Sequence, residues 1–268
     1  MDTLLIILTF VFGVVVGSFL NVVSLRFNTG VGLGGRSKCM SCGAQLGWKE
    51  LVPILSFLAQ GGACRKCGGR ISWQYPLIEL MTGAVFALIF INFPPIKAGS
   101  AVVTSLHILA ACLLVIITAY DVKHKIIPDQ LVYAFGAIAL IGLFVGGDPL
   151  WHMPGYGALL AGSILALPFA LLWLISKGTW MGLGDAKLAL GIGWMLGISG
   201  GVNAVILSFW IAAAAGITWM LFTYRRFRPR TEIPFGPYLI LGMYLVLFLG
   251  IEVLDVGLLR ELFIFYLL

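Results

Sequence analysis

Long apolar stretches recur along almost the whole chain and constrain its fold more than any other feature. A helix that spans a membrane needs about 20 mostly apolar residues, and the 268-residue sequence offers eight candidate stretches. Hydrophobic residues make up 60% of the chain and charged residues 10%, whereas soluble proteins are about half apolar and about a quarter charged. We therefore expect an all-α polytopic membrane protein with about eight transmembrane helices. The stretches lie near residues 3–25, 76–93, 100–120, 129–146, 156–176, 185–199, 201–224 and 234–256.

The basic residues are concentrated in alternate loops between these stretches. Of the 17 Lys and Arg residues, only Lys97 and Arg260 fall on the opposite side. The positive-inside rule then places the basic loops in the cytoplasm and both termini on the outer side. Because the charges are dispersed beside the spans, they suit the anionic headgroups of a lipid bilayer, and we expect no nucleic-acid partner.

Two Cys-x-x-Cys pairs stand in the one long polar segment, residues 26–75. They are Cys39 with Cys42 and Cys64 with Cys67, separated by 21 residues. Four thiolates at this spacing suit tetrahedral zinc, while disulfides or unliganded thiols are the alternatives. A reducing cytoplasmic loop disfavours disulfides, and so small a domain needs a structural metal to fold. The sequence therefore predicts a small cytoplasmic zinc-binding loop domain.

Two aspartates are expected where apolar stretches meet the cytoplasmic side. Asp121 ends the third stretch, and Asp185 opens the sixth within Gly182-Leu183-Gly184-Asp185. A carboxylate at the centre of a spanning helix costs about 2.5 to 3.5 kcal/mol, so a pair near membrane depth calls for a functional reason. Two close carboxyls that share a proton can activate water for peptide hydrolysis without a metal. The alternative is that each aspartate only caps a helix, as we expect for Asp129.

The sequence resembles the prepilin peptidases, also called type IV leader peptidases, over nearly its whole length. Six segments carry this resemblance, in order along the chain. They are Gly17–Val22, the cysteine loop with Pro53–Ser56, Tyr75–Leu80, Asp121–Asp129, Gly182–Leu188 and Pro234–Tyr238.

The resemblance implies that Asp121 and Asp185 form the catalytic pair of a membrane aspartic protease. Members of the family cut the short basic leader from prepilins or pseudopilins at the cytoplasmic face of the bacterial inner membrane. Many members then methylate the new amino terminus with S-adenosylmethionine. The resemblance therefore implies a peptidase, with methyl transfer as a second activity in many members.

Several further residues are expected to contact the substrate or to divide the catalytic work. Glu79 either reaches the lipid headgroups or binds the basic leader, and Gly182, Gly184 and Lys187 are candidates for the substrate cleft. Because Asp121 ends a helix and Asp185 begins one, the helix dipoles favour Asp121 as the acid and Asp185 as the base.

We expect three parts in the chain: a first transmembrane helix at 1–25, the cysteine loop at 26–75 and a peptidase domain at 76–268. Two other functions fit parts of the sequence. A presenilin-like intramembrane aspartyl protease would explain Gly-x-Gly-Asp but not the cysteine loop. The other is a non-enzymatic transporter or scaffold with a zinc module; inverted repeats would support a transporter, and the sequence shows no convincing internal symmetry.

Overall fold

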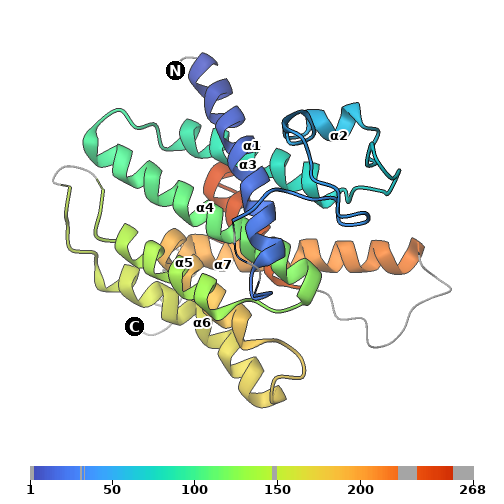
Figure 1. Ribbon diagram of the computed structural model, residues 1–268. Coiled ribbons are helices and arrows are strands. Elements are labelled where there is room, and N and C mark those ends of the chain that lie inside the picture. The colour runs from blue at the N-terminus through green and yellow to red at the C-terminus, as the bar shows by residue number, and fades with distance from the viewer. Residues whose placement is uncertain (1–2, 31, 33, 147–149, 223–233, 256–268) are drawn as a thin grey trace, which may run out of the picture. The chain divides into compact units, whose positions relative to one another are not determined.

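The computed structural model describes residues 3–30, 32, 34–146, 150–222 and 234–255. These residues form helices joined by turns and loops, with three isolated β-bridges, which confirms the predicted all-helical class. The chain divides into two compact units, Met1–Pro94 and Pro95–Leu268 (Figure 1).

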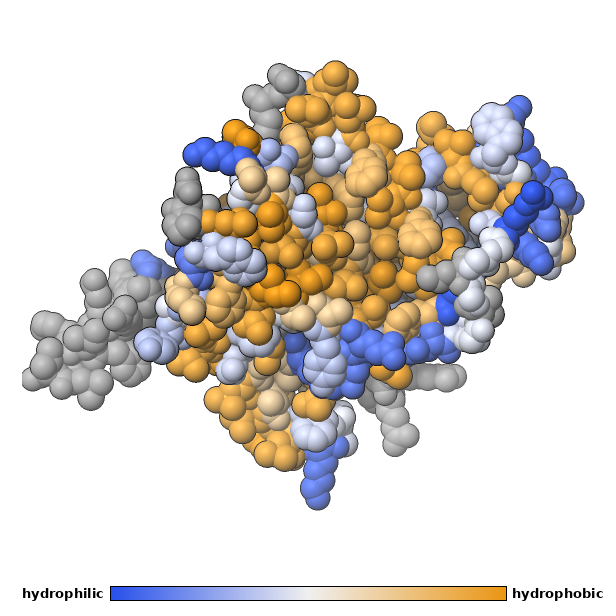
Figure 2. Space-filling model, turned by 60° about the vertical axis from the view of Figure 1, so that its left-hand side comes forward, coloured by the Kyte–Doolittle hydropathy of each residue, from blue (hydrophilic) through white to orange (hydrophobic). Residues whose placement is uncertain are grey.

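Five helices in the described part of the chain are long and apolar enough to cross a membrane. Much of the face shown in Figure 2 is hydrophobic, as expected where helices contact lipid. The five are α1 (Thr3–Arg26), α3 (Gln74–Asn92), α4 (Ala98–His124), α6 (Tyr156–Ser176) and α7 (Leu183–Phe222).

The prediction of eight spanning helices is not confirmed. Two of the predicted spans are the short apolar helices α5 (Asp129–Gly142) and α8 (Gly236–Leu249), of 14 residues each, where about 20 are needed. Another, 185–199, and the described part of 201–224 fall within α7, where Gly197 interrupts the helical backbone with φ 72° and ψ −176°. The basic residues predicted for the loop after residue 224 (Arg225, Arg226, Arg228 and Arg230), and Arg260 near the C-terminus, lie outside the described residues.

In the first unit, α1 and α3 pack against each other in opposite directions. Small residues on α1 allow the close approach: a Cβ at Gly13 would lie 2.9 Å from the Cα of Gly83, and one at Gly17 would lie 2.9 Å from Thr82. Small residues at helix interfaces are typical of packing within membranes. The loop between the two helices holds the short helices η1 (Trp48–Glu50) and α2 (Leu55–Ala59).

In the second unit, α7 is the central helix and packs against α5, α6 and α8, while α4 packs against α5 and α8 (Figure 1). The α6–α7 contact is close because a Cβ at Gly193 would lie 2.6 Å from the carbonyl oxygen of Ala161. Fully buried side chains from four of these helices form the core. They include Ile117, Phe135, Leu188, Ile192 and Leu239.

Candidate functional site

Asp121 and Asp185 are brought together in the second unit by α4 and α7. Asp121 lies in the last turn of α4 and Asp185 in the first turn of α7, and their side chains are only 4% and 8% exposed. They are close enough for the charge of Asp121 to act on Asp185. Two interacting buried carboxyls can hold one proton between them, which leaves one carboxylate free to deprotonate a water molecule.

The start of α8 provides the hydrogen-bond donor for Asp121. The backbone N–H of Gly236, the first residue of α8, donates to Oδ2 of Asp121 over 3.1 Å. A Cβ at residue 236 would lie 2.7 Å from that same oxygen, so any larger residue would force α8 or the carboxyl group to shift. Besides the two aspartate side chains, the site therefore includes the backbone at the start of α8. This backbone fixes the direction of the Asp121 carboxyl group.

This contact removes the basis for the expected division of labour between the aspartates. The sequence places Asp121 at the C-terminal end of a helix, where the dipole disfavours negative charge. In the structure, Asp121 also accepts the first N–H of α8, and a helix N-terminus favours negative charge. Both aspartates thus meet a helix N-terminus, and helix position alone does not distinguish acid from base.

Ile127 packs against both the glycine before Asp185 and the glycine whose N–H bonds to Asp121. A Cβ at Gly184 would lie 2.8 Å from the Cβ of Ile127, and a Cβ at Gly236 would lie 3.2 Å from its Cδ1. Ile127 is 8% exposed and lies in the short link between α4 and α5. The glycine before Asp185 therefore serves close packing, whereas Gly182 has only Asp185 Oδ2 and the Gly184 backbone nitrogen within 4 Å of its Cβ position.

Lys187 and Asp129 form an ion pair beside this packing. Nζ of Lys187 lies 2.7 Å from Oδ1 of Asp129 and 5.0 Å from the ring centroid of Tyr133. The side chains are 20% and 62% exposed. The expectation that Asp129 caps α5 is wrong, because Pro128 is the N-cap residue and no side chain caps the helix. The pair instead connects the first turn of α5 to the N-terminal part of α7.

Glu79 lies in the first unit and is buried, with 5% exposed. Its Oε2 accepts the backbone N–H of Ile54 over 2.7 Å, and its carboxyl also bonds the side chain of Ser18. The carboxyl therefore joins α3 to the cysteine loop and to α1.

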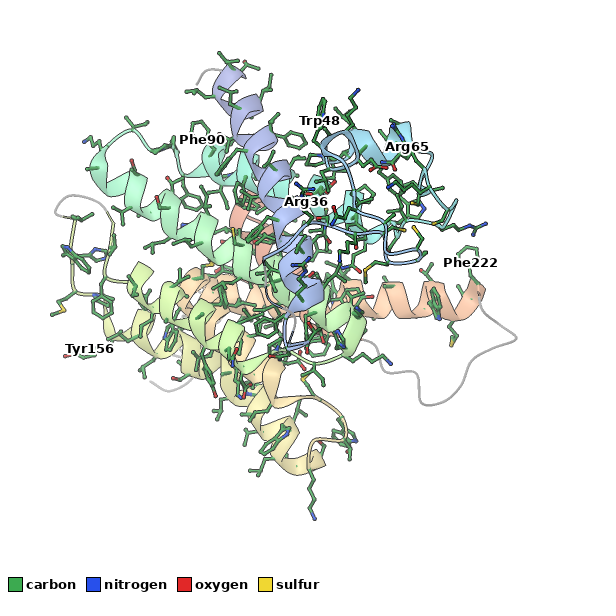
Figure 3. All side chains as sticks on the ribbon, in the orientation of Figure 1. Arg36, Trp48, Arg65, Phe90, Tyr156 and Phe222 are labelled. Carbon is green, nitrogen blue, oxygen red and sulfur yellow. The ribbon has the colours of Figure 1, made fainter. Side chains whose placement is uncertain are left out.

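The four cysteines of the loop converge as the sequence predicts. Their sulfur atoms all lie within 4.8 Å of one another, none is in a disulfide, and Sγ of Cys39 is 3.9 Å from Sγ of Cys67. Sulfurs bound at about 2.3 Å around tetrahedral zinc lie about 3.8 Å apart, so the spacing fits that metal. Figure 3 labels Arg36, Trp48 and Arg65, whose side chains belong to this loop.

The two cysteine pairs have matching backbone turns. The N–H of Gly43 donates to the carbonyl of Cys39 over 2.9 Å, and the N–H of Gly68 donates to that of Cys64 over 2.8 Å. Both glycines have positive φ, at 70° and 68°. Since most residues avoid that conformation, glycine allows each turn to fold back around its sulfurs.

The backbone of the loop also favours one thiolate before any metal binds. Hydrogen bonds from the backbone of Cys42 and Ser41 lower the pKa of Cys39 to about 6. At Cys67 the backbone of Gly69 favours the thiolate, but hydrogen bonds with Cys42 and burial outweigh it, and the pKa rises to about 11. The first thiolate of the cluster thus belongs to Cys39.

Ile127 and the N–H of Gly236 are the parts of the site whose contacts sequence reasoning missed. Both stand in segments that carried the family resemblance, Asp121–Asp129 and Pro234–Tyr238. Their contacts join residues 57 or more positions apart or depend on a backbone atom, so no local pattern predicts them.

Two family models match the chain and correspond to its two units. The Bacterial Peptidase A24 N-terminal domain matches residues 11–93, and the Type IV leader peptidase family matches residues 108–217. No solved structure is a significant match.

Curated relatives match over most of their length. A Bacillus subtilis protein named prepilin leader peptidase/N-methyltransferase is 31% identical over 247 residues, which cover 92% of this chain and 95% of that protein. A protein of the same name from Xanthomonas campestris is 31% identical, over 91% of each chain. Another from Pseudomonas aeruginosa is 30% identical, over 92% of this chain and 91% of its own.

Proposed function

Because the chain belongs to the type IV leader peptidase family, we propose that it is a membrane aspartic endopeptidase that removes the short basic leader of prepilins or pseudopilins. Asp121 and Asp185 are its catalytic residues. The observation that carries the proposal is the burial of these two interacting carboxyls at helix ends, with one of them aimed by the Gly236 N–H.

The reaction needs no metal at the aspartate pair. One carboxyl holds a proton and polarises the scissile carbonyl, while the other, as carboxylate, removes a proton from the attacking water. The proton then passes to the leaving amine, and the roles reset when the products leave. Desolvation strengthens these interactions, because both groups are shielded from bulk water.

Topology supports a cytoplasmic active site in a bacterial inner membrane. The positive-inside rule assigns the basic loops to the cytoplasm, and both aspartates lie at helix ends next to such loops. We propose both termini on the outer side, which requires an even number of spans such as the eight expected from the sequence. The partners of the chain are then the lipid bilayer and the prepilin substrate, and the reaction involves no nucleic acid.

The substrate presents an extended backbone to the two aspartates. We propose that it passes Gly182, where few atoms lie near the Cβ position, while Gly184 serves packing. Lys187 is held by Asp129, so it positions the start of α7 in addition to any contact with substrate. Glu79 remains a proposed contact for a positively charged part of the substrate.

Zinc is the metal that suits the four cysteines, and its role is structural because they leave no open coordination position. Residues 26–75 act as this metal-binding domain, after the first helix at 1–25 and before the peptidase domain at 76–268. The names of the relatives support N-methylation of the new amino terminus as a second activity, which uses S-adenosylmethionine as methyl donor.

Purified protein in detergent and a prepilin-like peptide test the proposal. The peptide carries a basic leader, a glycine before the cut and an apolar tail, and mass spectrometry locates the cleavage. We expect cleavage after the glycine, lowered at least about 10³-fold by Asp121→Asn or Asp185→Asn. Asp255→Asn is the matched control and should cleave normally.

Other outcomes would reject the proposal. Cleavage inside the apolar tail would identify an intramembrane protease, and unchanged turnover in either amide variant would remove the aspartates from catalysis. Labelled S-adenosylmethionine in the same reaction tests methyl transfer, because the label should appear on the mature amino terminus only.

A further inference from the structure

A group of buried and partly buried polar side chains lies between α1 and α3 and has no part in the peptide hydrolysis proposed above. Ser18 and Asn21 come from α1 and Glu79 from α3. Asn21 is 0% exposed and Glu79 is 5% exposed. The antiparallel packing places them at one end of the helix pair, since Nδ2 of Asn21 donates to the carbonyl of Tyr75, one turn before Glu79.

This group contains more hydrogen-bond acceptors than donors. Oδ1 of Asn21 is buried and has no hydrogen-bond partner among the described residues, which is rare because a buried acceptor also loses its hydrogen bonds to water. Glu79 accepts bonds from the N–H of Ile54 and the side chain of Ser18, but a carboxylate can accept about four. Within the described part of the chain, no Lys, Arg or His pairs with Glu79. The missing partner is therefore a donor, and a positive charge would suit it best.

The turn that covers Glu79 is strained and can be displaced. Ile54 has φ 58° and ψ −54°, a conformation that β-branched residues rarely adopt, and the N–H of Leu55 bonds to the carbonyl of Pro53 across it. The hydrogen bond from Ile54 to Glu79 holds this conformation in place. A ligand that donates to Glu79 would replace that bond and allow the turn to relax.

We propose that Ser18, Asn21 and Glu79 bind a primary ammonium group, that of the new amino terminus which leader removal produces. An ammonium has three N–H donors and no acceptor, and thus supplies what Asn21 Oδ1 and the Glu79 carboxylate lack. Its charge neutralises the buried carboxylate. The proposal rests on the proposed peptidase function, which creates this amine, and it gives the first unit the task of holding the product terminus.

Direct binding of a product peptide tests the site without requiring any turnover. Two peptides with the sequence of the mature product, one with a free amino terminus and one N-acetylated, are titrated into the full-length protein in nanodiscs. We expect the free-amine peptide to bind at least about tenfold more tightly, and Glu79→Gln to remove most of that difference. Equal binding of the two peptides to the unaltered protein would overturn the proposal.

Turnover then distinguishes the sources of an ammonium group. In Glu79→Gln the ratio of methylated to cleaved product should fall at least about tenfold. If the KM for cleavage rises instead and the ratio stays constant, the ligand is a lysine of the leader and the assignment to the new terminus is wrong. If the unaltered protein cleaves no peptide, the proposed function fails, and the binding result still decides the site.

Two controls test whether Glu79→Gln acts only by loosening the cysteine loop. Thr82→Val alters a buried hydroxyl that bonds only to the carbonyl of Ile78 on its own helix, and it should leave peptide discrimination unchanged. Zinc content is measured for every variant. Loss of discrimination in Glu79→Gln together with loss of zinc, or equal loss in Thr82→Val, would assign Glu79 a structural role only and overturn the proposal.

Discussion

The backbone N–H of Gly236 donates to Oδ2 of Asp121 over 3.1 Å and joins the start of α8 to the end of α4. A backbone donor cannot change rotamer, so it holds the carboxyl in one direction more firmly than a flexible side chain would. The aspartate pair therefore depends on three helices, although only α4 and α7 supply its side chains.

Replacing this glycine should impair catalysis while the fold persists. In Gly236→Ala the new Cβ would lie 2.7 Å from Asp121 Oδ2, so α8 or the carboxyl group must shift. A displacement of about 1 Å in a catalytic group lowers rates about 10²-fold, and we expect kcat/KM to fall by about that factor. The peptide-cleavage assay measures it.

Gly157→Ala is the matched control, because residue 157 lies in α6 with no atom within 4 Å of its Cβ position. It should retain full activity and the same thermal unfolding midpoint. Comparable activity in Gly236→Ala and Gly157→Ala would show that the Gly236 contact has no catalytic importance.

The Lys187–Asp129 pair should act as one unit. Because both side chains are partly exposed, we expect Lys187→Met or Asp129→Asn to lower stability by only about 0 to 1 kcal/mol. Each variant should lower kcat/KM by a similar factor, about three- to tenfold, because each releases the first turn of α7 that carries Asp185. The double variant should be no worse than either single variant.

The measurement is a double-mutant cycle on both kcat/KM and thermal unfolding. If Lys187 instead contacts the substrate directly, Lys187→Met alone should raise KM and Asp129→Asn should leave it unchanged. Additive losses would likewise contradict a shared role.

The sequence predicts the chemistry of this site better than its support. Cys39, Cys64 and the two aspartates could be identified because their side chains carry the chemistry and stand in short local motifs. The role of Gly236 could not, since its contact uses a backbone atom 115 positions from Asp121. The pairing of Lys187 with Asp129 was not predicted either. An aspartate that follows a proline at a helix start also fits a capping role, which is what the sequence suggested for Asp129.

Eight spanning helices are not confirmed within the described residues, because hydropathy measures apolar length and not helix length. Residues 131–146 are mostly apolar, but α5 ends at Gly142 and the chain then turns into a bridge between Val145 and Trp151. In the same way, Gly250 with φ 60° ends α8 before the apolar stretch is complete. Backbone turns of this kind depend on tertiary context and leave little trace in composition.

Removal of one buried cysteine should empty the metal centre. Cys64→Ser replaces a thiolate ligand that is 6% exposed, and we expect zinc content to fall from about one per chain to below about a tenth. The loop should then become sensitive to proteases, because metal binding supplies its folding free energy. Metal analysis and limited proteolysis measure both effects. Cys112 lies in α4, outside the cluster, so Cys112→Ser serves as the control and the variant should retain zinc.

The metal-free loop should contain one cysteine that is reactive in mildly acidic solution. The pKa of Cys39 is lowered to about 6, so its thiolate persists at neutral pH and is lost only as the pH falls through about 6. The pKa of Cys67 is raised to about 11, so that thiol should react only in strongly alkaline solution.

After chelation of zinc, alkylation by iodoacetamide followed by peptide mass spectrometry gives the rate at each cysteine against pH, because only thiolates react. We expect the midpoint for Cys39 near pH 6, about 2.5 units below the ordinary cysteine value of about 8.5. A midpoint at the ordinary value, or faster reaction at Cys67 than at Cys39 at pH 7, would contradict the hydrogen bonding that the backbone of Cys42 and Ser41 gives to Cys39.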